Sequence, residues 1–292
     1  MTLYQLELDQ RNVDCGMSYV FQLDSGEFFL IDGGFFTEGE AERLYRFLRE
    51  RSDGKPVIAD WFFSHAHQDH IGVFLDMMLN HGKDVELRGL TYNFQPLALP
   101  ETDEGWRVKS NDLATVRKFY EVVAEHCAGV PVRTPHVGDR WTLESLEIET
   151  LFTHEELRRE SSFNDHSTVI RVTCEGQAIL FLGDIWKEGC RYMLETEPEK
   201  LRCDLVQVSH HGFDGATEEL YRATGAKTAL WPTAVYNLKP NEDRPANRYL
   251  MTQSGITEHL VSGRGTAALP LPYTPGSFRI ISRLEENLQG NI

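Results

Sequence analysis

Hydrophobic positions along the chain follow two spacings, one typical of β-strands and one typical of helices. Continuous or alternating apolar runs that end at turn residues predict strands, which in the first half cover residues 17–23, 27–31, 57–63 and 85–93. Apolar residues that recur every three or four positions predict helices, here over residues 38–51, 71–79 and 110–127. The first half therefore begins with a hairpin and continues as alternating helices and strands.

The second half follows a similar order. It opens with predicted strands, over residues 146–152, 167–174 and 177–182. Helices and strands then alternate, with helices predicted over residues 186–195, 217–224 and 247–253 and strands over residues 205–209 and 227–231. Strands followed by helix–strand units in each half favour two packed sheets with helices outside. Since no repeat or linker divides the chain, we expect one domain over residues 1–292.

Composition and charge narrow the class of function. The chain has 292 residues, 41% hydrophobic and 25% charged, which is typical of a globular protein with a substantial core. Its 45 Asp and Glu outnumber its 29 Lys and Arg, for a formal net charge of −16. Because nucleic acids are bound mainly through clustered Lys and Arg, we expect a small-molecule substrate and no extended nucleic-acid surface. A metal ion can still supply local positive charge.

The lack of a recognisable signal peptide and the scattered cysteines lead us to expect a cytoplasmic protein. The first residues, MTLYQLELDQ, have neither a basic region nor an apolar core of a signal peptide. No apolar run is long enough to cross a membrane, so we expect no membrane contact. The five cysteines are scattered and form no C-x-x-C pair, which predicts reduced thiols. The oligomeric state is left open.

A cluster of metal-ligand side chains follows the predicted strand 57–63. His65, His67, Asp69 and His70 lie within six residues, where the strand ends and a helix begins. Imidazole nitrogens and carboxylate oxygens suit zinc, and manganese or iron accept the same donors. This spacing predicts two neighbouring metal positions.

Two later segments have the same placement at strand ends. The apolar strand 177–182 ends in Gly183-Asp184, and the strand 205–209 ends in His210-His211-Gly212. Taken alone, such an Asp is often a turn residue and such a His pair is often polar surface. Together with the first cluster, they supply the bridging carboxylate and further imidazole that a two-metal site requires.

These motifs resemble the metallo-β-lactamase fold superfamily. The resemblance is carried by His65-x-His67-x-Asp69-His70, then Gly183-Asp184 and His210, with Asp32-Gly33-Gly34 matching the early Asp motif. The second half is most similar to the soluble hydrolase domain of ComEC/Rec2-like competence proteins. The matching segments are Asn164-Asp165-His166-Ser167, Phe181-Leu182-Gly183-Asp184 and Val208-Ser209-His210-His211-Gly212. The resemblance implies an αββα sandwich of two mixed β-sheets, with helices on the outer faces and two divalent metal ions at one edge.

The resemblance also implies roles for individual residues. His65 and His67 would hold one metal ion, Asp69, His70 and His210 would hold the second, and Asp184 would bridge both. Asp32 would support the histidine-rich loop through hydrogen bonds. His166 departs from the common family pattern and is a further candidate ligand of the first ion. His210 is preferred to His211 because it comes first after the strand, and His211 would then face the substrate. Either His211 or His166 would protonate a leaving group.

The implied reaction is metal-dependent hydrolysis. Two cations about 3.5–4 Å apart can share a hydroxide and lower the pKa of its parent water toward ~7. Asp69 would orient this nucleophile for attack on phosphorus or a carbonyl carbon. The ComEC-like segments favour a small phosphodiester substrate, and a carbonyl ester, lactone or thioester is the alternative. A non-catalytic metal-binding regulatory module and an iron-dependent redox use of the same ligands stay open as other classes.

Overall fold

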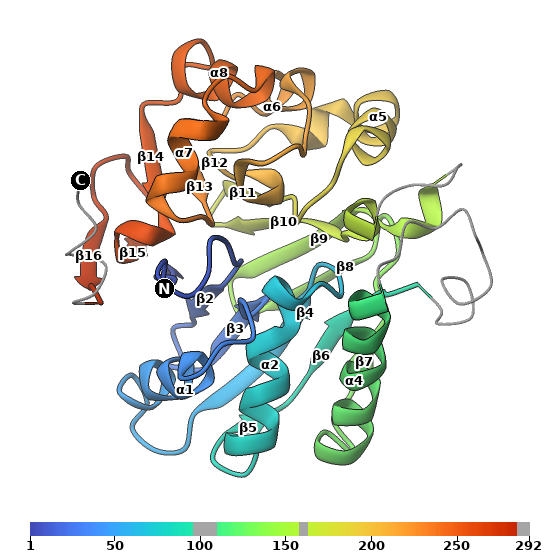
Figure 1. Cartoon of the computed structure of the whole chain (residues 1–292), viewed down its shortest axis with the longest axis vertical. Helices are drawn as coiled ribbons and strands as arrows, with labels where there is room; N and C mark the ends of the chain where they lie inside the picture. Colours follow the sequence, from blue (N-terminus) through green and yellow to red (C-terminus); the bar gives the residue numbers. More distant parts are fainter. Residues whose placement is uncertain (96–109, 158–162, 285–292) are drawn as a thin grey trace.

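Two β-sheets face each other and helices cover both outer faces (Figure 1). The computed structural model describes residues 1–95, 110–157 and 163–284. This arrangement confirms the predicted αββα sandwich of two mixed sheets, since each sheet contains both parallel and antiparallel pairs.

The first sheet is built from strands of both chain ends. Within the described residues its order is β16-β15-β1-β2-β3-β4-β6-β7, and β5 also pairs with β4. The strands span β1 Thr2–Gln5, β2 Tyr19–Gln22, β3 Phe28–Ile31, β4 Val57–Phe63, β5 Glu86–Leu87, β6 Leu90–Tyr92, β7 Val132–Arg133, β15 Thr266–Pro270 and β16 Arg279–Ser282. The pairs β3–β4 and β4–β6 are parallel, so these strands end at the same edge of the sheet.

The second sheet has the order β14-β13-β12-β11-β10-β9-β8 within the described residues. Its strands span β8 Arg140–Leu143, β9 Leu146–Phe152, β10 Val169–Cys174, β11 Gln177–Phe181, β12 Leu205–Gln207, β13 Thr228–Trp231 and β14 Glu258–Val261. The strands from β11 to β14 run parallel, and their carboxyl ends therefore share one edge.

Alternating side chains of the strands divide the core into layers. In β3, Phe29 and Ile31 point into the core between the sheets, whereas Phe28 and Leu30 join the core beneath the helices. The first sheet packs against α1 Glu40–Arg49, α2 Gln68–His81 and α4 Ser110–His126. The second packs against α5 Lys187–Thr196, α6 Glu218–Thr224, α7 Val235–Asn241 and α8 Pro245–Thr252.

The structure differs from the predicted elements in two respects: one predicted strand is divided, and several elements were missed. The expected strand 85–93 is two short strands, β5 and β6, because Gly89 lies against the Ala59 carbonyl and the chain pairs with β4 on either side of it. The hydrophobic pattern also missed seven elements, namely β1, β7, β8, β14, β15, β16 and α7. Since β15 pairs with β1, the last strands return to the first sheet and do not extend the second.

Candidate metal centre

The predicted ligands come together because the strands that precede them end at one edge of the sandwich. Asp32 follows β3, the segment 65–70 follows β4, Asp184 follows β11, and His211 follows β12. The pairs β3–β4 and β11–β12 are parallel. Each pair of carboxyl ends therefore delivers its side chains to the same place, between the two sheets.

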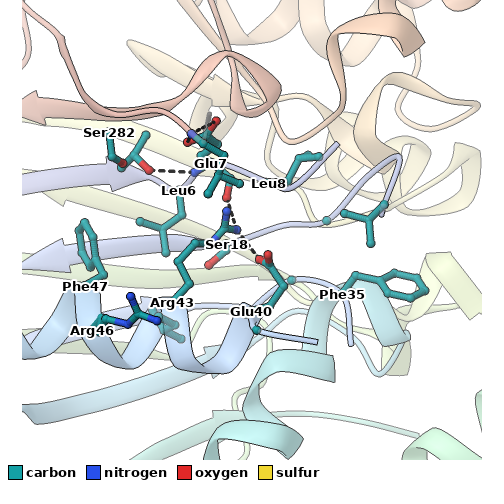
Figure 2. Close-up of a pocket in the computed structure, with 18 of the residues that line it drawn as sticks. Leu6, Glu7, Leu8, Ser18, Phe35, Glu40, Arg43, Arg46, Phe47 and Ser282 are labelled. Carbon is teal, nitrogen blue, oxygen red and sulfur yellow. Dashed lines mark hydrogen bonds and ion pairs between the residues drawn. The ribbon is translucent and has the colours of Figure 1, made fainter. Parts of the chain in front are cut away.

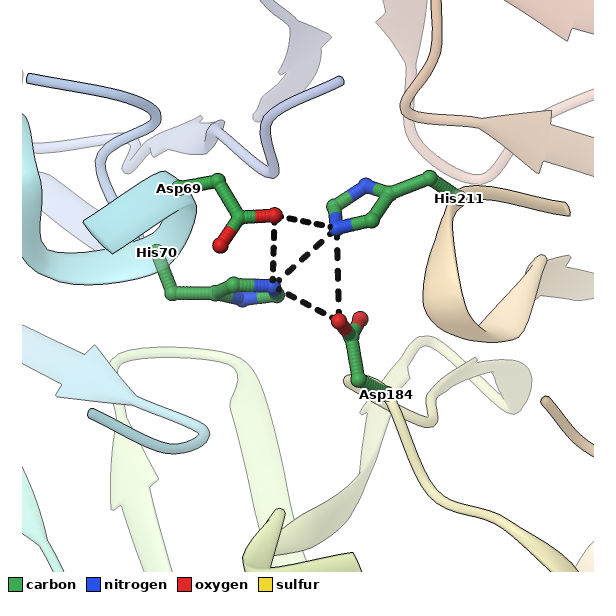
Figure 3. Close-up of side chains that lie close together, drawn as sticks. All are labelled: Asp69, His70, Asp184 and His211. Atoms are coloured by element: carbon green, nitrogen blue, oxygen red, sulfur yellow. Dashed lines mark hydrogen bonds and ion pairs between the residues drawn. The ribbon is translucent and has the colours of Figure 1, made fainter. Parts of the chain in front are cut away.

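One group of donor atoms consists of Asp69, His70, Asp184 and His211, whose ligand atoms all lie within 4.8 Å of one another (Figure 3). His70 Nε2 lies 3.2 Å from both Asp184 Oδ2 and His211 Nε2. His211 Nε2 lies 2.8 Å from Asp69 Oδ2 and 3.3 Å from Asp184 Oδ2. Four convergent donors of this kind form a compact cradle for one divalent cation.

A second group consists of His65, His67 and Asp184. His65 Nε2 lies 2.9 Å from His67 Nδ1 and 3.8 Å from Asp184 Oδ2. Asp184 therefore belongs to both groups, as expected of a bridging carboxylate.

Asp32 holds the histidine-rich loop from behind, as the resemblance implied. Its carboxylate accepts hydrogen bonds from the Ser64 amide, from the Ser64 hydroxyl and from His70 Nδ1, each at 2.7 Å. Because a carboxylate only accepts here, the Nδ1 proton of His70 points to Asp32 and its Nε2 faces the group.

The other imidazoles are oriented in the same way. His211 Nδ1 lies 2.8 Å from the Pro232 carbonyl, which can only accept, so Nε2 is directed at the group. Ser64 Oγ lies 3.1 Å from His65 Nδ1 but gives its proton to Asp32. His65 Nδ1 thus faces the two serine hydroxyls of Ser64 and Ser167, and its Nε2 is the atom directed at His67 and Asp184.

The segment Asn164-Asp165-His166-Ser167 connects the two sides of the centre. Asn164 Nδ2 lies 3.1 Å from His210 Nε2, and Asp165 accepts a hydrogen bond of 2.7 Å from the Trp186 amide at the start of α5. Ser167 Oγ accepts from the Asp184 amide at 2.9 Å and lies 3.2 Å from His65 Nδ1. His166 lies beside Phe163 and His154 and outside both groups of donor atoms.

The structure places His211, and not His210, among the donors, which corrects the preference for His210. Both residues adopt left-handed backbone conformations, with φ of 49° and 56°. This turn reverses the expected order: the His210 ring lies against Trp186 and Asn164, and the His211 ring points into the cluster. The sequence motifs predicted that His211 could protonate a leaving group. Its Nδ1 faces the Pro232 carbonyl and its Nε2 lies in the donor group, so neither nitrogen is well placed for this role.

The electrostatics of the first group favour positive charge. Burial alone would lower the pKa of His211, but the carboxylates of Asp184 and Asp69 outweigh it and raise this pKa to about 10. The same carboxylates raise the pKa of His70 against the effect of burial. The pKa of Asp184 is held well below its ordinary value by His211 and His70, although burial opposes this shift. A divalent cation would replace the protons that these shifts describe.

The second group has the opposite character. Burial, with further effects of neighbouring groups, lowers the pKa values of His65 and His67. Both imidazoles are therefore neutral near pH 7, the form in which histidine binds metals.

The chemistry of the donors fits two divalent cations. Asp184 Oδ1 is buried and accepts no hydrogen bond within the described residues, although leaving a buried carboxylate oxygen unsatisfied is costly. A cation bound to this oxygen of the shared Asp184 would satisfy it. The donor set is compatible with a dinuclear site and accepts zinc, manganese or iron alike.

Sequence reasoning missed three residues that hold the site. Ser64 and Ser167 act through the hydrogen bonds described above, and the Cys15 thiol donates to Asp69 Oδ2 at 3.4 Å. Ser64 directly precedes His65, and Ser167 directly follows His166, so adjacency to the motifs was the available signal. Cys15 lies 54 residues from Asp69 and carries no such signal.

The chain resembles known proteins in sequence. The family model of the metallo-beta-lactamase superfamily matches residues 12–229. ComE operon protein 3 of Bacillus subtilis (strain 168) is 27% identical over 221 residues, which are 72% of this chain and 26% of that protein. The match thus spans about a quarter of that relative's length.

Solved structures share the fold at low sequence identity. The metallo-beta-lactamase fold protein YhfI from Bacillus subtilis superposes with a TM-score of 0.54 at 12% identity, over 90% of this chain and 98% of that protein. CmlA, a diiron beta-hydroxylase from Streptomyces venezuelae, superposes with a TM-score of 0.50 at 12% identity, over 92% of this chain and 53% of that protein. Within the described residues, no helix is long and apolar enough to cross a membrane.

Proposed function

The chain belongs to the metallo-β-lactamase superfamily, as its motifs predicted, and from this premise we propose that it is a metal-dependent hydrolase of small phosphodiesters. The observation that carries the proposal is the pair of donor groups that share Asp184. Two cations bound there would supply Lewis-acid activation of water and stabilisation of developing negative charge.

The side chains define where a substrate would approach. The side chains of His65, His70 and Asp184 are no more than 1% exposed, whereas that of His67 is 20% and that of Asp69 is 15% exposed. The centre therefore opens on the side of His67 and Asp69, and we assign the substrate to this side.

Asp69 would orient the attacking water. Its Oδ2 lies in the donor group, and its Oδ1 points away from the group (Figure 3). This second oxygen is placed to accept a hydrogen bond from a water molecule and to receive its proton. The Cys15 thiol, which donates to Oδ2, would hold the carboxylate in this orientation.

The charge around the centre supports a small anionic substrate. Within the described residues, Asp69 and Asp184 form ion pairs only with histidines, and neither pairs with Lys or Arg. A substrate anion would therefore be attracted by the bound cations and not by a basic groove. The phosphodiester class is proposed from the ComEC-like segments of the second half, and the 27% identity to ComE operon protein 3 supports that resemblance. Zinc is the expected metal, and a cytoplasmic location and a single domain over residues 1–292 stay predictions.

A substrate panel tests the proposal. The purified protein, loaded in turn with Zn²⁺, Mn²⁺ or Fe²⁺, is assayed with bis(4-nitrophenyl) phosphate, 4-nitrophenyl acetate, a thioester and a lactone. We expect turnover of the phosphodiester above that of the carbonyl substrates. Higher turnover of an ester, thioester or lactone would move the function to the alternative class. Full metal loading without turnover of any substrate would favour a regulatory metal-binding module.

Variants connect the activity to the site. Replacing Asp184 by Asn or His65 by Ala should reduce kcat/KM by more than the about 10- to 100-fold that is usual for residues supporting a ligand. His136→Ala is the matched control, because this exposed histidine pairs with Glu155 outside both donor groups. Wild-type activity in Asp184→Asn would contradict the proposed function.

A further inference from the structure

Helices α1 and α4 lie on opposite sides of α2, the helix that begins in the metal-binding loop of residues 64–70 (Figure 1). On the α1 side, Glu40 and Arg43 line a cavity of about 450 Å³ and bond to each other there (Figure 2). Within the part of the chain that the structure describes, no side chain of α1 hydrogen-bonds to residues 64–70. Helix α1 therefore gives the donor groups no polar support.

The N-terminal part of α4, by contrast, reaches the metal-binding loop with two polar side chains. Asp112 Oδ2 lies 3.8 Å from His67 Nε2, and Thr115 Oγ1 accepts a hydrogen bond of 3.1 Å from Gln68 Nε2. Asp112 and Thr115 are three positions apart, so they lie on one face of the helix. Phe119, four positions further, continues this face and is buried in the core that also contains residues of α2. This face of α4 thus holds Asp112 beside the loop.

His67 is the least firmly held of the four imidazoles in the donor groups. Its side chain is 20% exposed, whereas those of the other three histidines are no more than 1% exposed. It is the N-cap residue of α2, but its side chain makes no capping hydrogen bond. Its ring packs against Phe163, with the centroids 4.7 Å apart. Ring packing holds the plane of an imidazole but does not decide which nitrogen faces the donors.

Asp112 distinguishes the two nitrogens of His67. Nδ1 faces the donor group, 2.9 Å from His65 Nε2, and Nε2 faces Asp112. Because a carboxylate only accepts, it favours the tautomer with the proton on Nε2, which leaves the Nδ1 lone pair for a cation. Burial lowers the pKa of His67, and the carboxylates of Asp69 and Asp112 are among those that oppose this shift. A cation on Nδ1 would make Nε2–H a stronger donor and increase its attraction to the carboxylate.

We propose that Asp112 is a positioning residue that directs His67 Nδ1 at the metal ion of its donor group. Asp32 holds His70 in the same way in the other group. The inference rests on the proposed function only through the dinuclear centre and not through the substrate. Since 3.8 Å is longer than a hydrogen bond, we expect an effect at the lower end of the about 10- to 100-fold range of such partners.

Zinc titration in competition with a chromophoric chelator tests the proposal. Asp112→Asn should weaken one of the two zinc affinities about tenfold and change the other by less than about twofold. Asp112→Glu keeps a carboxylate and should recover most of the loss. Glu218→Gln is the matched control, because Glu218 also lies in the first turn of a helix and pairs with Arg222 outside both donor groups. Circular dichroism checks folding, and Asp112→Ser, which keeps a small polar side chain at the helix start, is a second variant without the carboxylate.

Two backgrounds assign the effect to one donor group. His211→Ala leaves the group with His65 and His67 intact, so adding Asp112→Asn should weaken the remaining zinc ion about tenfold. His67→Ala leaves the other group intact, and adding Asp112→Asn should not change its zinc affinity. An acidic residue in the first turn also stabilises the helix itself. A purely structural role of this kind would loosen the whole loop and weaken zinc binding in both backgrounds.

Three results would overturn the inference while leaving the proposed function in place. They are wild-type affinities in a folded Asp112→Asn protein, an equal loss for both zinc ions, and no recovery in Asp112→Glu. A wild-type protein that binds fewer than two zinc ions would contradict the proposed dinuclear centre itself, and this inference with it.

Discussion

Replacing Asp32 by Asn tests whether the support behind the histidine-rich loop controls metal binding. The wild-type carboxylate accepts three hydrogen bonds of 2.7 Å from Ser64 and His70 and is fully buried. Asparagine has one acceptor oxygen and one NH₂ group. In either orientation of the amide, an N–H would face either the Ser64 amide or His70 Nδ1. The variant must therefore shift the loop or change the His70 tautomer, so that Nε2–H points at the metal position.

The size of the effect follows from the lost contact. A hydrogen bond to a buried charge contributes about 1.5–3 kcal/mol, and about 1.4 kcal/mol corresponds to a tenfold change in affinity. We therefore expect the cation of the group with Asp69, His70, Asp184 and His211 to bind about 10- to 100-fold more weakly in Asp32→Asn. The group with His65 and His67 should change less, since it contacts Asp32 only through Ser64.

Zinc titration in competition with a chromophoric chelator measures both affinities. Asp60→Asn is the matched control, because Asp60 is also a buried aspartate near the same strands but bonds to Thr91 outside the centre. Circular dichroism checks that both variants are folded. A folded Asp32→Asn protein that binds both zinc ions within about twofold of the wild-type affinity, well short of the usual effect of such support, would refute the reasoning.

Further predictions follow from the same geometry. His211→Ala should lose one bound metal equivalent by elemental analysis, and His210→Ala should keep both. Gly183→Ala should lower the free energy of unfolding by about 1–3 kcal/mol, because its φ is +54° and a Cβ would lie 2.8 Å from Ser167 Oγ; Gly176→Ala, with φ +82° and open space, should cost less. Burial raises the pKa of Asp60 to about 6, so its carboxyl stabilises the fold at low pH and this contribution disappears as pH rises through about 6. Asp60→Asn should therefore be more stable than the wild-type protein by up to about 3 kcal/mol at about pH 7, and the gain should vanish near pH 4 in urea unfolding. Chelation of the metals should lower Tm, since a cation that binds only the folded state stabilises it.

Much of the fold and the site was predictable because buried strands and their end residues have local signatures. The mostly apolar sequence of β4, interrupted only by Asp60, predicted the bounds of this strand, and the adjacent histidines marked its carboxyl end. The strands β1 and β15 were missed because they are short and pair over 260 residues of sequence separation. Pairing at such distance depends on the assembled sandwich, and no local pattern records it.

The order of His210 and His211 shows where pattern reasoning ends. Strand alternation assigns a side chain to a face only while the backbone stays extended, and β12 ends at Gln207. Within the described residues, five non-glycine residues have positive φ, and three of them, Asp32, His210 and His211, lie in the segments that build the centre. Such conformations cost about 1–3 kcal/mol each and persist only where surrounding contacts enforce them. Here those contacts are Ser64 and His70 for Asp32, and Pro232 for His211. The direction of the ligands thus depends on backbone strain stabilised by distant segments, which is why the motif identified the histidine pair but not the member that enters the donor group.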